Sequence, residues 1–246
     1  MEEKMEGFYK FTQRRIDDIV PEKTALIIVD MQKYQVKKDY SVYKGTNKIV
    51  PGLLDYFIEE VENTVIPNLK TMIEFCHQVE IPIIYTKFSS FMPDGSDLSQ
   101  GKRKLNEIAK NLDNDVAFPH ISHPGSDIID ELKPDKRDMI LQKNTSGTFM
   151  STRLDTFLTH MEIETVLVAG VVTNFCVHST AREAVDYGFH TVIIEDCCAA
   201  WSPEFHEFIL KSFGMLYGYI LPHKKVIKKI SKMMKKSKKE IDLTIS

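Results

Sequence analysis

The sequence predicts an α/β fold: a doubly wound, mainly parallel six-stranded sheet with helices on both faces. Two patterns predict it. Short apolar runs rich in β-branched residues alternate with segments whose apolar residues recur every three or four positions. Buried parallel strands and amphipathic helices have these patterns, and their alternation is typical of βαβ units. The length of 246 residues also falls within the range of one such domain.

Six apolar runs are the predicted strands. Several are almost continuously apolar, as expected for strands that are covered on both faces of a sheet. The predicted strands are Thr24–Asp30, Ile81–Phe88, Asp138–Lys143, Thr165–Gly170, His190–Asp196 and Met215–Leu221.

Four segments between these runs are predicted helices. Within the first of them, Pro67 has to fall at a helix start or at a break, because proline cannot donate the backbone hydrogen bond of a helix interior. Before the last helix, Ser202 followed by Pro203 is a typical helix start. The predicted helices are Tyr56–Val79, Ser151–Met161, Phe175–Tyr187 and Pro203–Leu210.

Composition changes divide the chain into three parts: an N-terminal extension over 1–20, the main domain over 21–222, and a lysine-rich C-terminal helix or tail over 223–246. Within the main domain, Phe91–Pro119 is polar and is either a lid-like insertion or a surface excursion between strands. The tail interleaves lysines with a helical apolar stripe. It is either a patch for an acidic partner or, as we favour, a solvated terminal helix that frays beyond Met234.

Charge and cysteine usage exclude several classes of protein. The formal net charge of −3 gives no reason to expect nucleic acid or membrane binding. The chain starts without the pattern of a targeting signal and has no apolar run near the ~20 residues of a membrane span. The four cysteines show no disulfide-framework spacing, so we expect a reduced, cytoplasmic protein. We interpret two of them, Cys197 and Cys198, as packing residues.

Three side chains that can act in catalysis lie at the ends of predicted strands. Asp30 ends the first predicted strand, Lys143 ends the third, and Cys176 follows the fourth after a short turn. Ligands of open parallel sheets bind at the carboxyl ends of the strands, so we expect these residues to converge there. A cysteine attacks as its thiolate, which a nearby lysine and a helix N-terminus would favour. Asp30 would accept the thiol proton and return it to the leaving amine.

Each residue alone has an ordinary structural interpretation, as a helix cap, a solvated lysine or a small buried hydrophobe. Their joint placement at three strand ends favours a catalytic site.

Three segments carry a family resemblance: TALIIVDMQ (24–32), QKNTSGTF (142–149) and VAGVVTNFCVHSTAREAVDYGF (168–189). They resemble the signature segments of the isochorismatase-like cysteine hydrolase superfamily, which includes nicotinamidases, N-carbamoylsarcosine amidase, biuret hydrolase and ureidoacrylate amidohydrolases. The third is the most specific, because its G-V-x-T-N-x-C arrangement is long and unusual. The likeness covers roughly residues 20 to 222 in the same order.

The resemblance implies a catalytic triad of Asp30, Lys143 and Cys176. It also implies a cis peptide between Val171 and Val172, which would set the N–H of Val172 beside that of Cys176 as an oxyanion hole. It further suggests a homo-oligomer, either a dimer or a tetramer. We expect no cofactor, because the histidines with which family nicotinamidases hold a metal are missing after Thr86.

Departures from the family's motifs reduce the number of reactions to be considered for this protein. Family nicotinamidases hold a metal through an Asp-x-His pair and another histidine after the second strand, whereas TKFSSFMPDGSDL here has none. His120 and His123 lie further on, between prolines, and we do not favour a metal site there. Members that cleave the vinyl ether of isochorismate commonly lack the cysteine that is present here as Cys176.

We therefore predict a cysteine hydrolase that cleaves a small linear amide, carbamoyl or ureido C–N bond through a thioester on Cys176, releasing ammonia or an amine. The alternatives are a nicotinamidase-type pyridine amide hydrolase, or a non-catalytic binding or scaffold protein that uses the basic tail. The small-molecule amide is the expected partner. The predicted substrate contacts follow strand ends: Gln32, Tyr34, Phe88, Ser89, Asn144, Ser146 and Trp201. For Trp201, packing in the core or at a subunit interface is an equal alternative.

Overall fold

A computed structural model describes residues 2–12, 16 and 19–245 of the chain. It confirms the predicted fold: one six-stranded sheet in which every pair of neighbouring strands is parallel, in the order β3-β2-β1-β4-β5-β6. The strands are β1 (Thr24–Val29), β2 (Ile83–Phe88), β3 (Met139–Lys143), β4 (Thr165–Val171), β5 (His190–Ala199) and β6 (Tyr219–Leu221).

The strand order places a topological switch point between β1 and β4. From β1 the chain winds outward through β2 to β3, then returns to β4 on the other side of β1 and winds outward through β5 to β6. Connections leave a crevice at the carboxyl ends of the two strands where the winding reverses. Residues that directly follow β1 and β4 are therefore the first candidates for a binding site.

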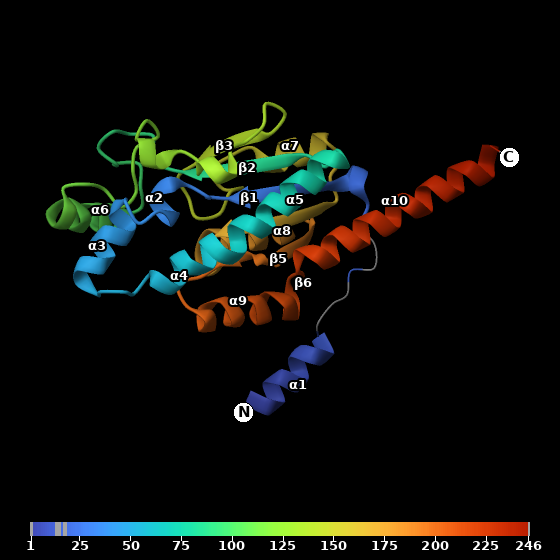
Figure 1. The fold of residues 1–246 in the computed structure, drawn as a ribbon, viewed down its shortest axis with the longest axis horizontal. Coiled ribbons are helices and arrows are strands. Elements are labelled where there is room, and N and C mark those ends of the chain that lie inside the picture. The colour runs from blue at the N-terminus through green and yellow to red at the C-terminus, as the bar shows by residue number, and fades with distance from the viewer. Residues whose placement is uncertain (1, 13–15, 17–18, 246) are drawn as a thin grey trace.

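Helices cover both faces of the sheet (Figure 1). On one face, α5 and α10 pack against β5 and against each other; on the other face, α8 and α9 pack against β5 and against each other. The helices are α1 (Glu2–Thr12), α2 (Lys33–Val36), α3 (Ser41–Ile49), α4 (Asp55–Glu60), α5 (Ile66–Gln78), α6 (Gln100–Asp113), α7 (Leu154–His160), α8 (His178–Asp186), α9 (Pro203–Leu216) and α10 (His223–Ile245). A π-helical segment, Val61–Val65, joins α4 to α5, and Pro67 lies in the first turn of α5, as predicted.

Two predicted boundaries were wrong near the C-terminal part of the domain. The predicted strand Met215–Leu221 begins only at Tyr219, because α9 continues to Leu216, well beyond the predicted Leu210. Ser202 caps this helix by accepting the N–H of Phe205, and apolar residues at helical spacing then keep one face buried. A short apolar run looks the same at the end of a buried helix as in a strand.

Strand β5 is longer than predicted and continues past Asp196 to Ala199. Cys197 and Cys198 are therefore strand residues, and both are buried in the main hydrophobic core. Their interpretation as packing residues is confirmed.

The polar segment Phe91–Pro119 contains a helix that the sequence did not predict. This helix, α6, packs against α3 beside the carboxyl ends of β1 and β2, on the left of Figure 1. Its polar composition suggested a loop because only one side of the helix meets the protein. As described below, the segment forms one wall of a cavity.

Close contact between β1 and β4 depends on a glycine. Gly170 pairs with Val29 and has a φ of +111°, a conformation that residues with side chains rarely adopt. A Cβ at this position would clash with the backbone carbonyl of Val29. The glycine therefore lets the ends of the two strands approach one another at the switch point.

The lysine-rich tail contains the whole of α10. Val226 and Ile230 are fully buried and Ile227 packs against the core, which matches the predicted apolar stripe, whereas Met234 is exposed. The backbone is helical to Ile245. The distal half of α10 projects away from the body of the molecule (Figure 1). Among the described residues, no helix is both long and apolar enough to span a bilayer.

Candidate active site

The structure brings Asp30 and Lys143 together at the carboxyl edge of the sheet. Asp30 directly follows β1 and Lys143 is the last residue of β3. Since β2 lies between these strands, the long lysine side chain has to reach across its end. Lys143 Nζ lies 2.8 Å from Asp30 Oδ2, and both side chains are completely buried.

Further hydrogen bonds to the two charged groups compensate for the burial of this ion pair. Thr86 donates its hydroxyl to Asp30 Oδ1 at 2.6 Å, and Lys143 Nζ donates to the carbonyls of Thr145 and Ser146 at 3.0 and 2.9 Å. Burial alone would lower the pKa of Lys143, but the Asp30 carboxylate and the neighbouring Cys176 raise it above its usual value. Lys143 is therefore a fixed positive charge in the site. Thr86 was not predicted, although a threonine within an otherwise apolar strand was a usable signal.

Cys176 lies in a π-helical turn, Thr173–Val177, that precedes α8. This corrects the predicted helix Phe175–Tyr187, whose regular α-helical part begins only at His178. The peptide bond between Val171 and Val172 is cis, at the position that the family resemblance implied. The carbonyl of Val172 accepts the N–H groups of Phe175 and Val177 at 2.9 and 3.3 Å, which closes the turn around the cysteine.

The thiol of Cys176 is close enough to Asp30 and Lys143 for each of them to change its pKa. Burial raises the pKa of the thiol above its usual value; the ammonium groups of Lys143 and Lys102 lower it, and the Asp30 carboxylate raises it. The net direction is upward, although Lys143 lowers the pKa of the thiol, as expected. A neutral thiol beside a carboxylate needs that carboxylate as the proton acceptor.

Iodoacetamide is expected to alkylate Cys176 and to leave the other three cysteines unmodified in the folded protein. Cys176 is only partly buried and lines a cavity, whereas Cys76, Cys197 and Cys198 are buried. Because the thiolate reacts and the pKa of Cys176 is raised, the rate should keep rising as the pH passes the usual range of cysteine. Peptide mapping after timed labelling between pH 7 and 10 measures both effects. A rate that is already maximal near neutral pH would instead indicate a thiolate.

A cavity of ≈ 430 Å³ opens above the thiol. Four of the predicted substrate contacts line it: Tyr34, Phe88, Ser146 and Trp201. Val172 and Cys176, the two predicted oxyanion-hole residues, also line it. The remaining walls come mainly from α3 and α6, two helices that were not predicted from the sequence.

Three predicted substrate contacts, Gln32, Ser89 and Asn144, do not line the cavity. Gln32 is buried; its side-chain amide donates to the carbonyls of Phe88 and Ser126 and accepts the N–H of Phe88, so it ties the end of β2 in place. The hydroxyl of Ser89 donates to the carbonyl of Phe88, and Asn144 donates to Asp97. A position after a strand end brings a residue near the site, but these side chains turn to neighbouring backbone or loop groups.

His120 and His123 do not fit the metal site that was considered for them. Both ring nitrogens of His120 have partners, Ser122 Oγ at 2.8 Å and the carbonyl of Phe91 at 3.2 Å. His123 Nδ1 accepts the N–H of Gly125. In the described parts of the chain, neither histidine belongs to a group of three or more side chains with metal-ligating atoms close together.

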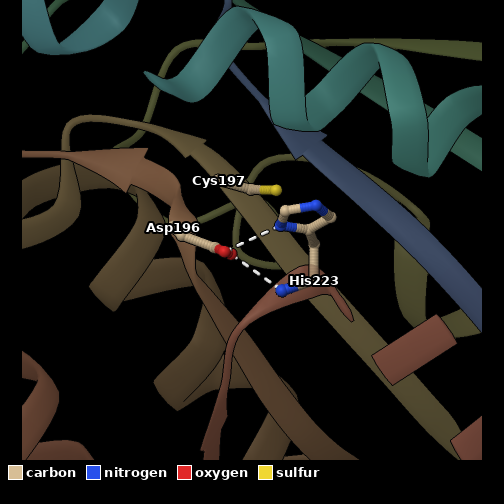
Figure 2. A group of neighbouring side chains, drawn as sticks. All are labelled: Asp196, Cys197 and His223. Atoms are coloured by element: carbon tan, nitrogen blue, oxygen red, sulfur yellow. Dashed lines mark hydrogen bonds and ion pairs between the residues drawn. The ribbon is translucent and has the colours of Figure 1, made fainter. Parts of the chain in front are cut away.

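One such group lies elsewhere, at the start of α10: Asp196, Cys197 and His223 have donor atoms within 4.8 Å of one another. In Figure 2 the Asp196 carboxylate faces both the ring and the backbone N–H of His223, and the Cys197 sulfur points toward the ring. The two hydrogen bonds to His223 measure 2.7 and 2.8 Å. Because both carboxylate oxygens are already occupied, we interpret the group as the anchor of α10 on β5.

Comparison with known proteins gives the family. Residues 24–224 match the isochorismatase domain, and the chain therefore belongs to the isochorismatase family. The ureidoacrylate amidohydrolase RutB of Acinetobacter baylyi is 27% identical over 211 residues, which cover 82% of this chain and 81% of the relative. Nicotinamidase 3 of Arabidopsis thaliana is 26% identical over 192 residues, which cover 77% of this chain and 91% of the relative.

Solved structures share the fold at lower sequence identity. A cysteine hydrolase from Pseudomonas syringae superimposes with a TM-score of 0.72 at 22% identity, covering 89% of this chain and 96% of the other. N-carbamoylsarcosine amidase from Thermoplasma acidophilum gives a TM-score of 0.57 at 22% identity, covering 82% of this chain and 96% of the other. At this level of identity the likeness shows the architecture alone.

Proposed function

We propose that this protein is an amidohydrolase that cleaves the C–N bond of a carbamoyl, ureido or similar small non-peptide amide through a thioester on Cys176. The observation that carries this proposal is the arrangement of a cavity-facing thiol beside a buried aspartate–lysine pair. The names of two relatives, a ureidoacrylate amidohydrolase and an N-carbamoylsarcosine amidase, support the substrate class.

In the first half-reaction, Asp30 accepts the proton of the Cys176 thiol while the sulfur attacks the amide carbon. Asp30 Oδ2 has no hydrogen bond of good geometry among the described residues, apart from its ion-pair contact with Lys143, and is thus the oxygen available for this proton. The positive charge of Lys143 stabilises both the carboxylate and the developing thiolate. Asp30 then gives the proton to the departing nitrogen, and the C–N bond breaks to leave a thioester.

The backbone N–H groups of Val172 and Cys176 are the proposed oxyanion hole. Val172 directly follows the cis peptide, Cys176 lies in the turn Thr173–Val177, and both residues line the cavity. Donors held in place at the developing oxyanion are often worth about 3–4 kcal/mol each in activation free energy. In the second half-reaction, water activated by Asp30 hydrolyses the thioester and restores the thiol.

A nicotinamidase is the second candidate, since Arabidopsis nicotinamidase 3 matches most of the chain. The side chains argue for the first candidate. The segment after β2 has no histidine, and His120 and His123 are engaged in other hydrogen bonds. Among the described residues, nothing therefore corresponds to the histidines with which family nicotinamidases hold the metal that binds the pyridine nitrogen.

An ammonia-release screen distinguishes the candidates. The panel is biuret, N-carbamoyl amino acids, ureidoacrylate, maleamate and nicotinamide, each with and without a chelator. We expect hydrolysis of at least one carbamoyl or ureido compound, insensitive to the chelator, and none of nicotinamide. Hydrolysis of nicotinamide alone, lost on chelation, would establish the second candidate in place of the first.

A further inference from the structure

We propose that Lys102 binds an acidic group of the substrate while the facing walls of α3 and α6 hold an apolar body, so that the substrate is an anionic amide with a hydrocarbon side chain. This inference rests on the proposed function, because it concerns the specificity of the same cavity.

Among the described residues, Lys102 is the only one with a charged side chain that lines the cavity. Its Nζ lies 4.5 Å from the centre of the Phe88 ring and 5.9 Å from that of Phe118, and it donates to Ser146 Oγ at 3.3 Å. Of the ion pairs between described residues, none involves Lys102. The ammonium thus enters an aromatic pocket with a neutral hydroxyl and two rings as its neighbours.

A half-buried ammonium without a counter-ion is poorly compensated for its lost hydration. Burial lowers the pKa of Lys102, and the charge of Lys143 lowers it further, while Cys176 and Asp30 partly offset both effects. A substrate carboxylate would supply the missing charge partner in a site that is partly shielded from water. Because Lys102 interacts with the catalytic groups, this carboxylate would lie close to the bond that is cleaved.

The rest of the cavity is apolar and comes from two facing helices. Leu105, Ile108 and Leu112 follow Lys102 at helical spacing on one side of α6, and Val42 and Ile49 face them from α3. These walls are suited to a hydrocarbon group rather than to a small, fully polar amide. Two hydroxyls that line the same space, Ser41 Oγ and Tyr34 Oη, are buried without a protein partner of good hydrogen-bond geometry, although the Gln35 side chain lies beside Tyr34.

An N-carbamoyl amino acid with an apolar side chain combines these features. Its carboxylate is attached to the carbon next to the carbamoyl nitrogen, and its side chain leaves from the same carbon. Attack by Cys176 on the carbamoyl carbon forms an S–C bond. The bond from that carbon to the terminal nitrogen then breaks, and this nitrogen leaves as ammonia with the proton of the thiol. With one water, hydrolysis and decarboxylation of the resulting carbamate give the amino acid, ammonia and carbon dioxide.

The test compares N-carbamoyl-phenylalanine with 2-phenylethylurea, which has the same carbamoyl group and ring but no carboxylate. For the wild type we expect kcat/KM to favour the anionic compound by roughly 10-fold or more, the usual effect of one hydrogen bond to a charged group. In Lys102→Met this preference should fall to about 1, mainly through KM of the anion, and Lys102→Arg should restore part of it. The control Lys104→Met removes an exposed lysine from the other side of α6, outside the cavity lining, and should keep the preference.

Two results would overturn the proposal. One is a wild type that does not prefer the anion; the other is an equal loss of kcat for both compounds in Lys102→Met, which would make Lys102 an activator of the thiol. If neither compound is hydrolysed, binding of 3-phenylpropionate and 3-phenylpropan-1-ol to Cys176→Ala decides the question by calorimetry. Tighter binding of the anion that is lost with Lys102→Met supports the subsite even if the proposed reaction is wrong, and equal binding rejects it.

Discussion

Replacing Cys176 with alanine is expected to abolish amide hydrolysis and to leave the fold intact. Turnover should fall by at least about 1,000-fold, because the covalent intermediate cannot form without the sulfur and loss of a nucleophile is among the largest single effects on catalysis. The side chain lines a cavity and is only partly buried at the edge of the hydrophobic core, so shortening it should cost little stability. Ammonia release under saturating substrate measures the first effect, and thermal unfolding measures the second.

Cys76→Ala is the matched control for this experiment. It also removes one thiol, but from the buried face of α5, away from the cavity lining. We expect this variant to unfold at a somewhat lower temperature and to remain active. Full activity in Cys176→Ala would show that the reaction does not use this thiol, and the proposed thioester chemistry would have to be abandoned.

The proximity of Asp30 and Lys143 was predictable because the carboxyl ends of parallel strands lie at one edge of a sheet. Asp30 and Lys143 are more than a hundred residues apart in the sequence, yet both end strands whose carboxyl ends share one edge. The apolar runs identified those strands, and the order of the elements allowed few other topologies. The placement of Asp30, Lys143 and Cys176 at one edge of the sheet therefore followed from regular structure, and the family resemblance added the cis peptide, which no periodicity would have revealed.

The cavity walls were less predictable because they depend on irregular segments. In α6, the apolar residues line an open cavity, so the helix shows a narrow stripe among charged residues and its sequence resembles a surface loop. The sequence also does not show in which direction a side chain points. Gln32 and Tyr34 both follow β1, but only Tyr34 lines the cavity. Gln32 is the N-cap of the short helix α2 and Tyr34 lies within that helix, a local change of backbone that leaves no periodic signal in the sequence.

Asp30→Asn and Lys143→Met are each expected to destabilise the protein strongly and to abolish activity. Each change leaves the other member of a completely buried ion pair without its partner, which typically costs about 3–5 kcal/mol in the free energy of unfolding. In Asp30→Asn the Lys143 ammonium keeps only the carbonyls of Thr145 and Ser146. In Lys143→Met the Asp30 carboxylate keeps the hydrogen bond from the Thr86 hydroxyl. Urea unfolding of each variant measures the loss.

The double variant Asp30→Asn/Lys143→Met separates stability from catalysis. With both charges removed, the cost of an unpaired buried charge disappears, so the double variant should be more stable than either single variant. It should remain inactive, because Asp30 is the proposed proton acceptor and the thiol would have no base. The matched control is the surface pair Lys37–Glu131, where Glu131→Gln should change stability little because solvent screens the charges. Additive losses in the double variant would show that the two buried side chains are not coupled, and an active double variant would rule out Asp30 as the base.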